Sequence, residues 1–90
     1  MEQEVHIAGI VVYSLPARLD ATKSSIVSIP AAEIHAVSAD GKLIVTLEAD
    51  STRRILDFMD AIRALPGVVD VALVYQHAEP LTALEQEIPS

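Results

Sequence analysis

Apolar and polar residues alternate most regularly in the middle of the chain, directly after a turn signal at Asp40-Gly41. Leucine or valine occupies positions 43, 45 and 47, and the positions between and beside them include lysine, threonine and glutamate. A period of two places successive side chains on opposite sides of an extended chain, which is the pattern of a β-strand. We therefore predict a strand over residues 42–48 that lies in the interior of a sheet.

Two segments carry apolar residues at the three- and four-residue spacing of a helix. The first is predicted over residues 16–28, because Pro16 suits the first turn of a helix and Pro30 ends it. The second has the clearest apolar face in the sequence and ends at Pro66-Gly67. The apolar positions of this face are Ile55, Phe58, Met59, Ile62 and Leu65. The residues that can cap its first turn with a side-chain oxygen are Asp50, Ser51 and Thr52.

Three further strands are indicated by runs rich in β-branched and apolar residues. They are expected over residues 5–13, 33–38 and 68–76, and the second of them is the least apolar, which suits a sheet edge. After His77 the alternation ends, and the remaining residues include two prolines and several glutamates. We expect a single domain over residues 1–78, followed by a mobile acidic tail over residues 79–90.

The order of these elements is strand, helix, strand, strand, helix, strand. The two halves align without a gap when Pro30 is laid on Pro66, so each half is a β-α-β unit. Right-handed crossovers place both helices on the same side of one four-stranded antiparallel sheet. The predicted fold class is therefore α+β, a ferredoxin-like plait with the order β-α-β-β-α-β, whose first and third strands lie in the middle of the sheet.

The acidic composition narrows the classes of partner. The sequence has 13 aspartates and glutamates against 6 lysines and arginines, and its formal charge of -7 repels nucleic acid and anionic lipid surfaces but favours a basic partner. No apolar run reaches the ~18 residues of a membrane span, and the N-terminus lacks the basic start of a signal peptide. We expect a cytoplasmic protein with no nucleic-acid partner and no membrane insertion.

The sequence predicts neither an enzyme nor a metal site. The chain has no cysteine, which excludes thiolate metal sites such as the Cys-x-x-Cys loop of heavy-metal plaits. His6, His35 and His77 lie on separate strands or strand ends without a metal-ligand spacing. An acylphosphatase-like plait needs an asparagine, which this sequence lacks. An RNA-binding plait needs stacked aromatic residues and a basic surface, and this sequence indicates neither. We therefore expect a binding protein with no catalytic residues, no metal and no cofactor.

The sheet face away from the helices is the predicted binding surface. Alternation assigns one set of residues to the helix side: Leu43, Val45, Leu47, Val69, Val71 and Leu73. The expected binding residues on the opposite, open face are Ala8, Ile10, Val12, Ile44, Thr46, Glu48, Asp70, Ala72, Val74 and Gln76, with His6 beside them. An apolar surface on the order of several hundred Å² usually marks an interaction site, and Glu48 and Asp70 would give it an acidic rim.

Three groups of residues resemble one known family. They are Gly-Ile-Val-Val at 9–12, Gly-Lys-Leu-Ile-Val at 41–45 with Leu-Glu-Ala at 47–49, and Pro-Gly-Val at 66–68 with Val-Ala-Leu-Val-Tyr at 71–75. In order and spacing they resemble the NapD family over residues 5–77. The resemblance implies a ferredoxin-like fold and a cytoplasmic chaperone for the maturation of periplasmic nitrate reductase. It also implies that the twin-arginine signal peptide of the catalytic subunit NapA binds as a helix on the open sheet, and that Tat export waits until the molybdenum cofactor is loaded.

A self-associating regulatory or ligand-sensing module of the ACT type is the alternative that the sequence leaves open. Such a module would use the same sheet face as a dimer interface. Its glycine-rich ligand loop, between the first strand and the first helix, is replaced here by Ser14-Leu15-Pro16. A weak homodimer through the open face is compatible with both functions, and the two uses of the face would then compete.

Overall fold

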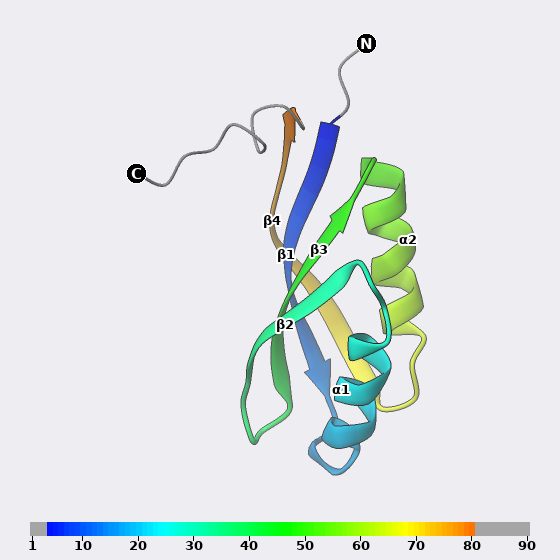
Figure 1. The fold of residues 1–90 in the computed structure, drawn as a ribbon. Coiled ribbons are helices and arrows are strands. Elements are labelled where there is room, and N and C mark those ends of the chain that lie inside the picture. Colours follow the sequence, from blue (N-terminus) through cyan, green and yellow to red (C-terminus); the bar gives the residue numbers. More distant parts are fainter. Residues whose placement is uncertain (1–3, 81–90) are drawn as a thin grey trace.

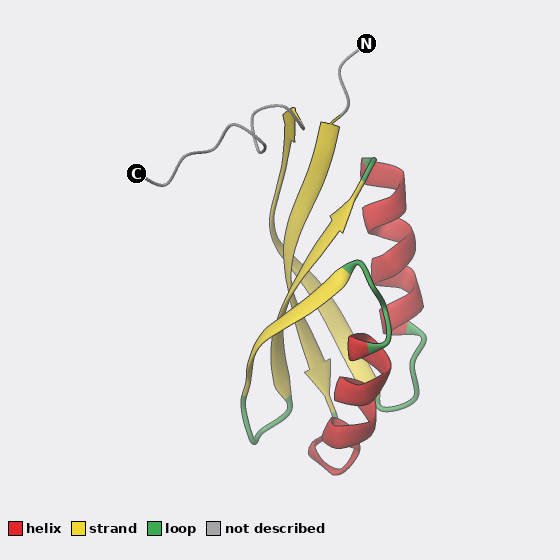
Figure 2. Ribbon diagram, in the orientation of Figure 1, coloured by secondary structure: helices red, strands yellow, loops and turns green. Residues whose placement is uncertain are grey.

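The computed structural model describes residues 4–80 as one four-stranded antiparallel sheet with two helices (Figure 1). The elements are β1 (Glu4–Ser14), a 3-10 turn η1 (Pro16–Arg18), α1 (Leu19–Val27), β2 (Ala32–Val37), β3 (Lys42–Ala49), α2 (Thr52–Arg63) and β4 (Val68–Pro80). The strand order is β2-β3-β1-β4, so β1 and β3 lie in the middle. Figure 2 shows both helices against the same face of the sheet. The predicted ferredoxin-like α+β fold is confirmed.

The two helices differ in how they begin. The predicted first helix is divided, because Pro16–Arg18 forms a 3-10 turn and only Leu19–Val27 is α-helical. No side-chain hydrogen bond caps α1. α2 has a cap: the hydroxyl of Ser51 accepts a hydrogen bond from the N–H of Arg54 at 3.1 Å. Of the three expected capping residues, Ser51 therefore takes this role, which satisfies one of the N–H groups that the first helical turn leaves without a partner.

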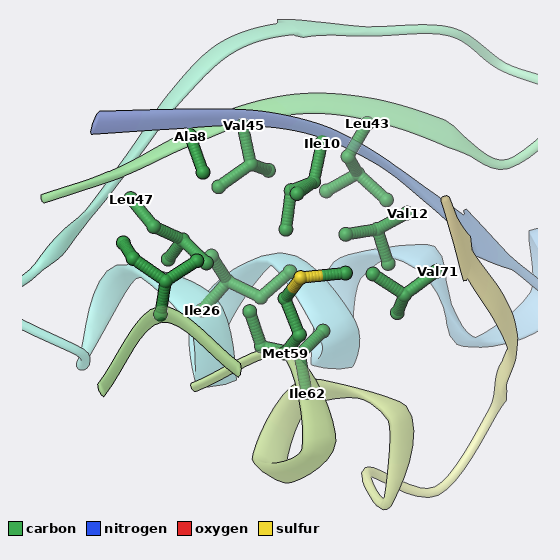
Figure 3. Close-up of a cluster of buried hydrophobic side chains, with 11 residues drawn as sticks. Ala8, Ile10, Val12, Ile26, Leu43, Val45, Leu47, Met59, Ile62 and Val71 are labelled. Carbon is green, nitrogen blue, oxygen red and sulfur yellow. The ribbon is translucent and has the colours of Figure 1, made fainter. Parts of the chain in front are cut away.

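The core lies between the sheet and the helices, and residues 4–80 contribute eleven buried apolar side chains to it (Figure 3). They are Ala8, Ile10, Val12, Ile26, Leu43, Val45, Leu47, Ile55, Met59, Ile62 and Val71. In Figure 3 the side chains of Ile10 and Val12 point from β1 toward Met59 and Ile62 of α2. Burial of each large apolar side chain stabilises the fold by roughly 1.5–3 kcal/mol, so this packing fixes which side of β1 faces the helices.

Two turns hold the end of β1 in place. Gly41 (φ 105°) and Gly67 (φ 90°) lie in the left-handed region that favours glycine. The N–H of Ser14 donates to the carbonyl of Gly41 at 2.7 Å, and the N–H of Leu15 donates to the carbonyl of Gly67 at 2.8 Å. The buried hydroxyls of Ser14 and Thr22 are hydrogen-bonded at 2.9 Å, which joins β1 to α1. The strand in the middle of the sheet is therefore fixed at this end.

β4 is longer than the alternation predicts. It runs through Pro80 instead of ending at residue 76, because its backbone pairs with β1 as far as Glu4 opposite Pro80. The antiparallel pairing with β1 holds these last positions in the sheet. The expected domain boundary at residue 78 therefore falls inside a strand. Residues 81–90, where most of the mobile acidic tail is expected, lie outside the described residues.

β4 forms one edge of the sheet, and side chains occupy part of that edge. The carbonyl of Val71 accepts a hydrogen bond from Nη2 of Arg63 at 3.0 Å. The N–H of Val71 donates to Oδ1 of Asp70 at 2.8 Å. Backbone groups at a sheet edge otherwise stay open to another strand. Both backbone groups of Val71 are thus already hydrogen-bonded within the chain.

Candidate functional site

The open face of the sheet carries the side chains that alternate with the buried core. In β1, Ala8, Ile10 and Val12 are 0% exposed and point toward the helices. The residues of β1 that alternate with them, and so lie on the open face, are Ile7, Gly9, Val11 and Tyr13. Their partners in β3, in the same order, are Glu48, Thr46, Ile44 and Lys42. Because directly paired residues of antiparallel strands share a face, these partners line the open face too.

The sequence prediction for β1 is wrong. Ala8, Ile10 and Val12 belong to the core and not to the open face, so a ligand on that face cannot contact their side chains. Positions 7–12 hold only apolar residues and one glycine, so no polar residue marks which side of the strand meets water. An assignment shifted by one residue moves every side chain to the other face.

A bulge in β4 brings an unpredicted residue to the open face. Gly9 pairs with Tyr75, whereas the next residue, Ile10, pairs with Leu73, so Val74 is the extra residue of the bulge. Val74 is 64% exposed. Tyr75 comes to lie opposite Gly9 on the open face, although simple alternation places it on the helix side. Alternation alone carries no signal for such a bulge.

Residues of β4 beyond a register shift lie on the face opposite to the predicted one. Gln76 pairs with Ala8, and its Nε2 donates to the hydroxyl of Thr52 at the start of α2 at 3.0 Å, so it lies on the helix side and not on the open face. A second shift leaves Val69 without a partner in β1, and it is 65% exposed instead of covered by the helices. Leu73 pairs with the buried Ile10 and so lies on the helix side as predicted, although it is 46% exposed.

The placements predicted for β3 and for the middle of β4 are confirmed. Ile44, Thr46 and Glu48 alternate with fully buried residues of β3 and lie on the open face. Asp70 and Ala72 pair with open-face residues of β1 and lie there as well. The polar residues of β3 lie on one side of the strand and so indicate which side meets water. The predicted face of β3 is correct for this reason.

The centre of the open face holds a hollow of about 520 Å³, which we call the apolar hollow. It is lined by Gly9, Ile10, Val11, His35, Ile44, Val45, Thr46, Val74 and Tyr75. The ring of Tyr75 lies directly over Gly9, because a Cβ placed on Gly9 would be 2.2 Å from Cε1 of Tyr75. The same ring stacks on His77, with 5.9 Å between the ring centroids and 17° between the planes. Glycine at position 9 therefore lets an aromatic ring lie close to the sheet.

A second hollow of about 360 Å³ adjoins the first, and we call it the acidic hollow. It is lined by Ile7, Pro30, Ala31, Ala32, Glu33, Thr46, Leu47 and Glu48. Two carboxylates, those of Glu33 and Glu48, belong to this lining. The N–H of Glu48 donates to the carbonyl of Ala31 at 3.0 Å, which holds the loop before β2 against β3. Glu33 lies outside the predicted site, because the sequence gives no indication of how β2 aligns with β3.

The two acids of the predicted rim lie at opposite ends of the open face. Glu48 pairs with Ile7, whereas Asp70 pairs with Tyr13. These ends are about 20 Å apart, because a strand rises about 3.4 Å per residue. The carboxylate of Asp70 also accepts a hydrogen bond from the N–H of Val71 at 2.8 Å. Of these two acids, Glu48 lines the acidic hollow.

The three histidines have polar neighbours. Nε2 of His35 is 2.8 Å from the hydroxyl of Thr46 at the edge of the apolar hollow, and Nε2 of His77 is 2.9 Å from Oε1 of Glu79. His6 lies 3.5 Å from a carboxylate oxygen of Glu4. Across residues 4–80, no three His, Cys, Asp or Glu side chains are grouped as a metal ion would require. Neither helix in this part of the chain is long and apolar enough to cross a membrane.

Comparison with known proteins gives concordant matches. Residues 5–80 match the family model described as NapD protein. A curated relative from Haemophilus influenzae, named Chaperone NapD, is 27% identical over 75 residues, which cover 82% of this chain and 81% of the relative. The solution structure of the E. coli Tat proofreading chaperone protein NapD matches with a TM-score of 0.77 and 25% identity, over 100% of this chain and 90% of that chain. The family match includes every strand that forms the open face.

Proposed function

We propose, from the fact that this chain belongs to the NapD family, that it is a chaperone for the maturation of periplasmic nitrate reductase. In this proposal it binds the twin-arginine signal peptide of the catalytic subunit NapA in the cytoplasm and delays Tat export until the molybdenum cofactor is loaded. Two relatives support the general role, since one is named a chaperone and the other a Tat proofreading chaperone. The binding function requires no catalytic group.

The observation that carries this proposal is the pair of adjoining hollows on the open face. A twin-arginine signal peptide combines a basic start with an apolar stretch, and the face combines carboxylates with an apolar surface. Burial of apolar area contributes ~25 cal/mol per Å², whereas an exposed ion pair contributes only ~0.2–1 kcal/mol. Apolar contact should therefore supply most of the affinity, and the carboxylates should supply orientation and association rate.

The proposed contact surface differs from the sequence prediction on β1 and β4. Ile44, Thr46, Glu48, Ala72 and Val74 remain in it, and Asp70 lies at its far end. The residues that the structure adds are Ile7, Val11, Glu33, His35 and Tyr75. The buried residues of β1 support the surface from beneath, because their packing fixes the strand on which it is built.

Titration calorimetry with a synthetic twin-arginine signal peptide tests the proposal. We expect saturable binding to the wild type and affinity at least about tenfold lower for Val74→Glu, which places an unpaired charge in an apolar contact. Leu56→Glu is the control: Leu56 is 46% exposed on α2, on the helix side of the sheet, so the affinity of this variant should equal that of the wild type.

The outcomes of this titration separate the alternatives. If the wild type binds no peptide, the chaperone function is rejected. If Val74→Glu and Leu56→Glu lose affinity equally, the open face is not the binding surface. Self-association through the open face is the competing use, and sedimentation of the peptide-free protein measures it. A dimer that persists at saturating peptide would contradict a shared surface.

A further inference from the structure

The two hollows of the open face follow one another along β3. Of these two hollows, Thr46 lines both, Ile44 lines the apolar one and Glu48 lines the acidic one. Glu48 also borders a neighbouring hollow whose lining includes Asp50 and Arg54. The surface therefore changes from apolar to acidic between Ile44 and Glu48. Glu33, which pairs with Thr46 from β2, adds a second carboxylate on the acidic side. A ligand with one charged end and one apolar part fits this face better in one direction than in the other.

The other end of the open face carries a different charge. Lys42 pairs with Tyr13 there, so an ammonium group stands where the strand pair ends. Asp70, the partner of Tyr13 in β4, already accepts a hydrogen bond from the N–H of Val71. A positively charged peptide end placed here would meet Lys42 and a carboxylate that is partly occupied. Like charges repel, so this end is the less favourable one for arginine.

Tyr75 adds an aromatic surface at the border of the two hollows. It pairs with Gly9, and Gly9 pairs with Thr46 on its other side, so the three residues form one row across the sheet. The Tyr75 ring is part of a residue that is 46% exposed. Guanidinium groups bind carboxylates through a planar fork of donors and also bind over aromatic rings, whereas lysine does both less well. The acidic hollow therefore offers the carboxylates, and the border beside it offers the aromatic ring, that arginine binds.

We propose that this asymmetry fixes the direction in which the signal peptide binds. The arginines lie at the acidic hollow beside Glu33 and Glu48, and the apolar stretch crosses the apolar hollow toward Tyr13, in the same sense as β1. About 13 residues of helix span the ~20 Å between the two ends, at 1.5 Å per residue. This inference rests on the proposed function, because it assumes that the occupant is a twin-arginine signal peptide.

Paramagnetic broadening tests the direction. A synthetic twin-arginine signal peptide with a nitroxide at its N-terminus should broaden the amide signals of Ile7 and Glu48 and leave those of Tyr13 and Lys42 sharp. The same peptide labelled at the C-terminal end of its apolar stretch should give the opposite pattern. Reversed patterns, or equal broadening at both ends, overturn the inference. An unlabelled peptide that shifts no amide signal defeats the proposed function instead, so the two failures are distinguishable.

Charge reversal at the two ends gives an independent test. Glu48→Lys should weaken binding of the twin-arginine peptide about tenfold, because it removes an attraction and adds a repulsion. The same reversal at the far end of the contact surface, Asp70→Lys, should weaken binding clearly less than Glu48→Lys, because the arginines lie away from that end. A peptide with both arginines replaced by glutamine should bind the wild type and Glu48→Lys equally. Equal losses for the two variants with the arginine peptide would overturn the inference.

Discussion

Gly9 shapes the open face because it has no side chain. The ring of Tyr75 occupies the space that a Cβ at this position would need, with the nearest ring atom at 2.2 Å. The ring is therefore held flat on the sheet, stacked on His77, and lines the apolar hollow without filling it. A larger residue at position 9 would leave the strand intact, since the clash is with a partly exposed side chain and not with backbone.

Gly9→Ala should displace the Tyr75 ring and alter the apolar hollow. We expect the free energy of unfolding to fall by about 1–3 kcal/mol, as for other overpacked sites, and peptide affinity to fall by roughly tenfold if the ring moves into the hollow. Urea denaturation and calorimetry measure the two effects. The double variant Gly9→Ala/Tyr75→Ala is the control, because it removes the clashing ring. If the loss in the free energy of unfolding of the double variant equals the sum of the losses of the two single variants, the proposed clash between position 9 and the Tyr75 ring does not exist.

At the scale of the elements, the phase of β1 decides which residues face a ligand. β1 is apolar on both sides, and its helix side is set by the packing of Ile10 and Val12 against α2 (Figure 3). The residues of β1 that alternate with these buried side chains then lie on the open face. The two sets of side chains differ little in polarity, so only their burial separates them.

Matched truncations on the two faces test this assignment. Ile10→Ala should lower the free energy of unfolding by about 2–5 kcal/mol, because it leaves a cavity in the core. Ile44→Ala removes the same atoms from a residue that is 42% exposed and should cost less than about 1 kcal/mol. Chemical denaturation measures both. Equal costs for the two truncations would contradict the assignment of Ile10 to the core.

The sequence predicted the elements better than the faces of the strands. In α2 and in β3, polar residues recur at regular intervals between the apolar ones. The sequence therefore indicates both the kind of element and the side of it that is buried. β1 lacks such markers, and a bulge in β4 reverses the alternation at Val74 without any signal in composition. The predicted face was therefore right for Ile44, Thr46 and Glu48 on β3 and wrong for Ala8, Ile10 and Val12 on β1. The pairing of Gly9 with Tyr75, a glycine opposite an aromatic ring, depends on register and becomes visible only in the folded sheet.

At the scale of the whole molecule, the helices cover one face of the sheet and the net charge is negative (Figure 2). A formal charge of -7 attracts a basic peptide from any direction, while the acidic hollow concentrates that attraction at one end of the open face. Charge should therefore act mainly on the rate of encounter, and apolar contact on the lifetime of the complex.

The association rate of a twin-arginine peptide should fall as salt rises. Screening shortens the range of the attraction to about 10 Å at 0.1 M salt, whereas apolar contact is little affected. Stopped-flow fluorescence with a labelled peptide measures the association and dissociation rates separately. A peptide with glutamine in place of both arginines is the control and should show a much weaker salt dependence. The same salt dependence for both peptides would contradict a role for the charge.

A protein that keeps an apolar surface in water and also has open sheet edges risks polymerising through its backbone. In this chain Arg63 and Asp70 occupy both backbone groups of Val71, so an incoming extended chain finds no continuous ladder along that stretch of β4. Stacking of copies into fibrils is hindered there, while the apolar face stays open to side-chain contact. Contacts with other molecules are therefore directed to the side chains of the open face and not to the backbone of this stretch of β4.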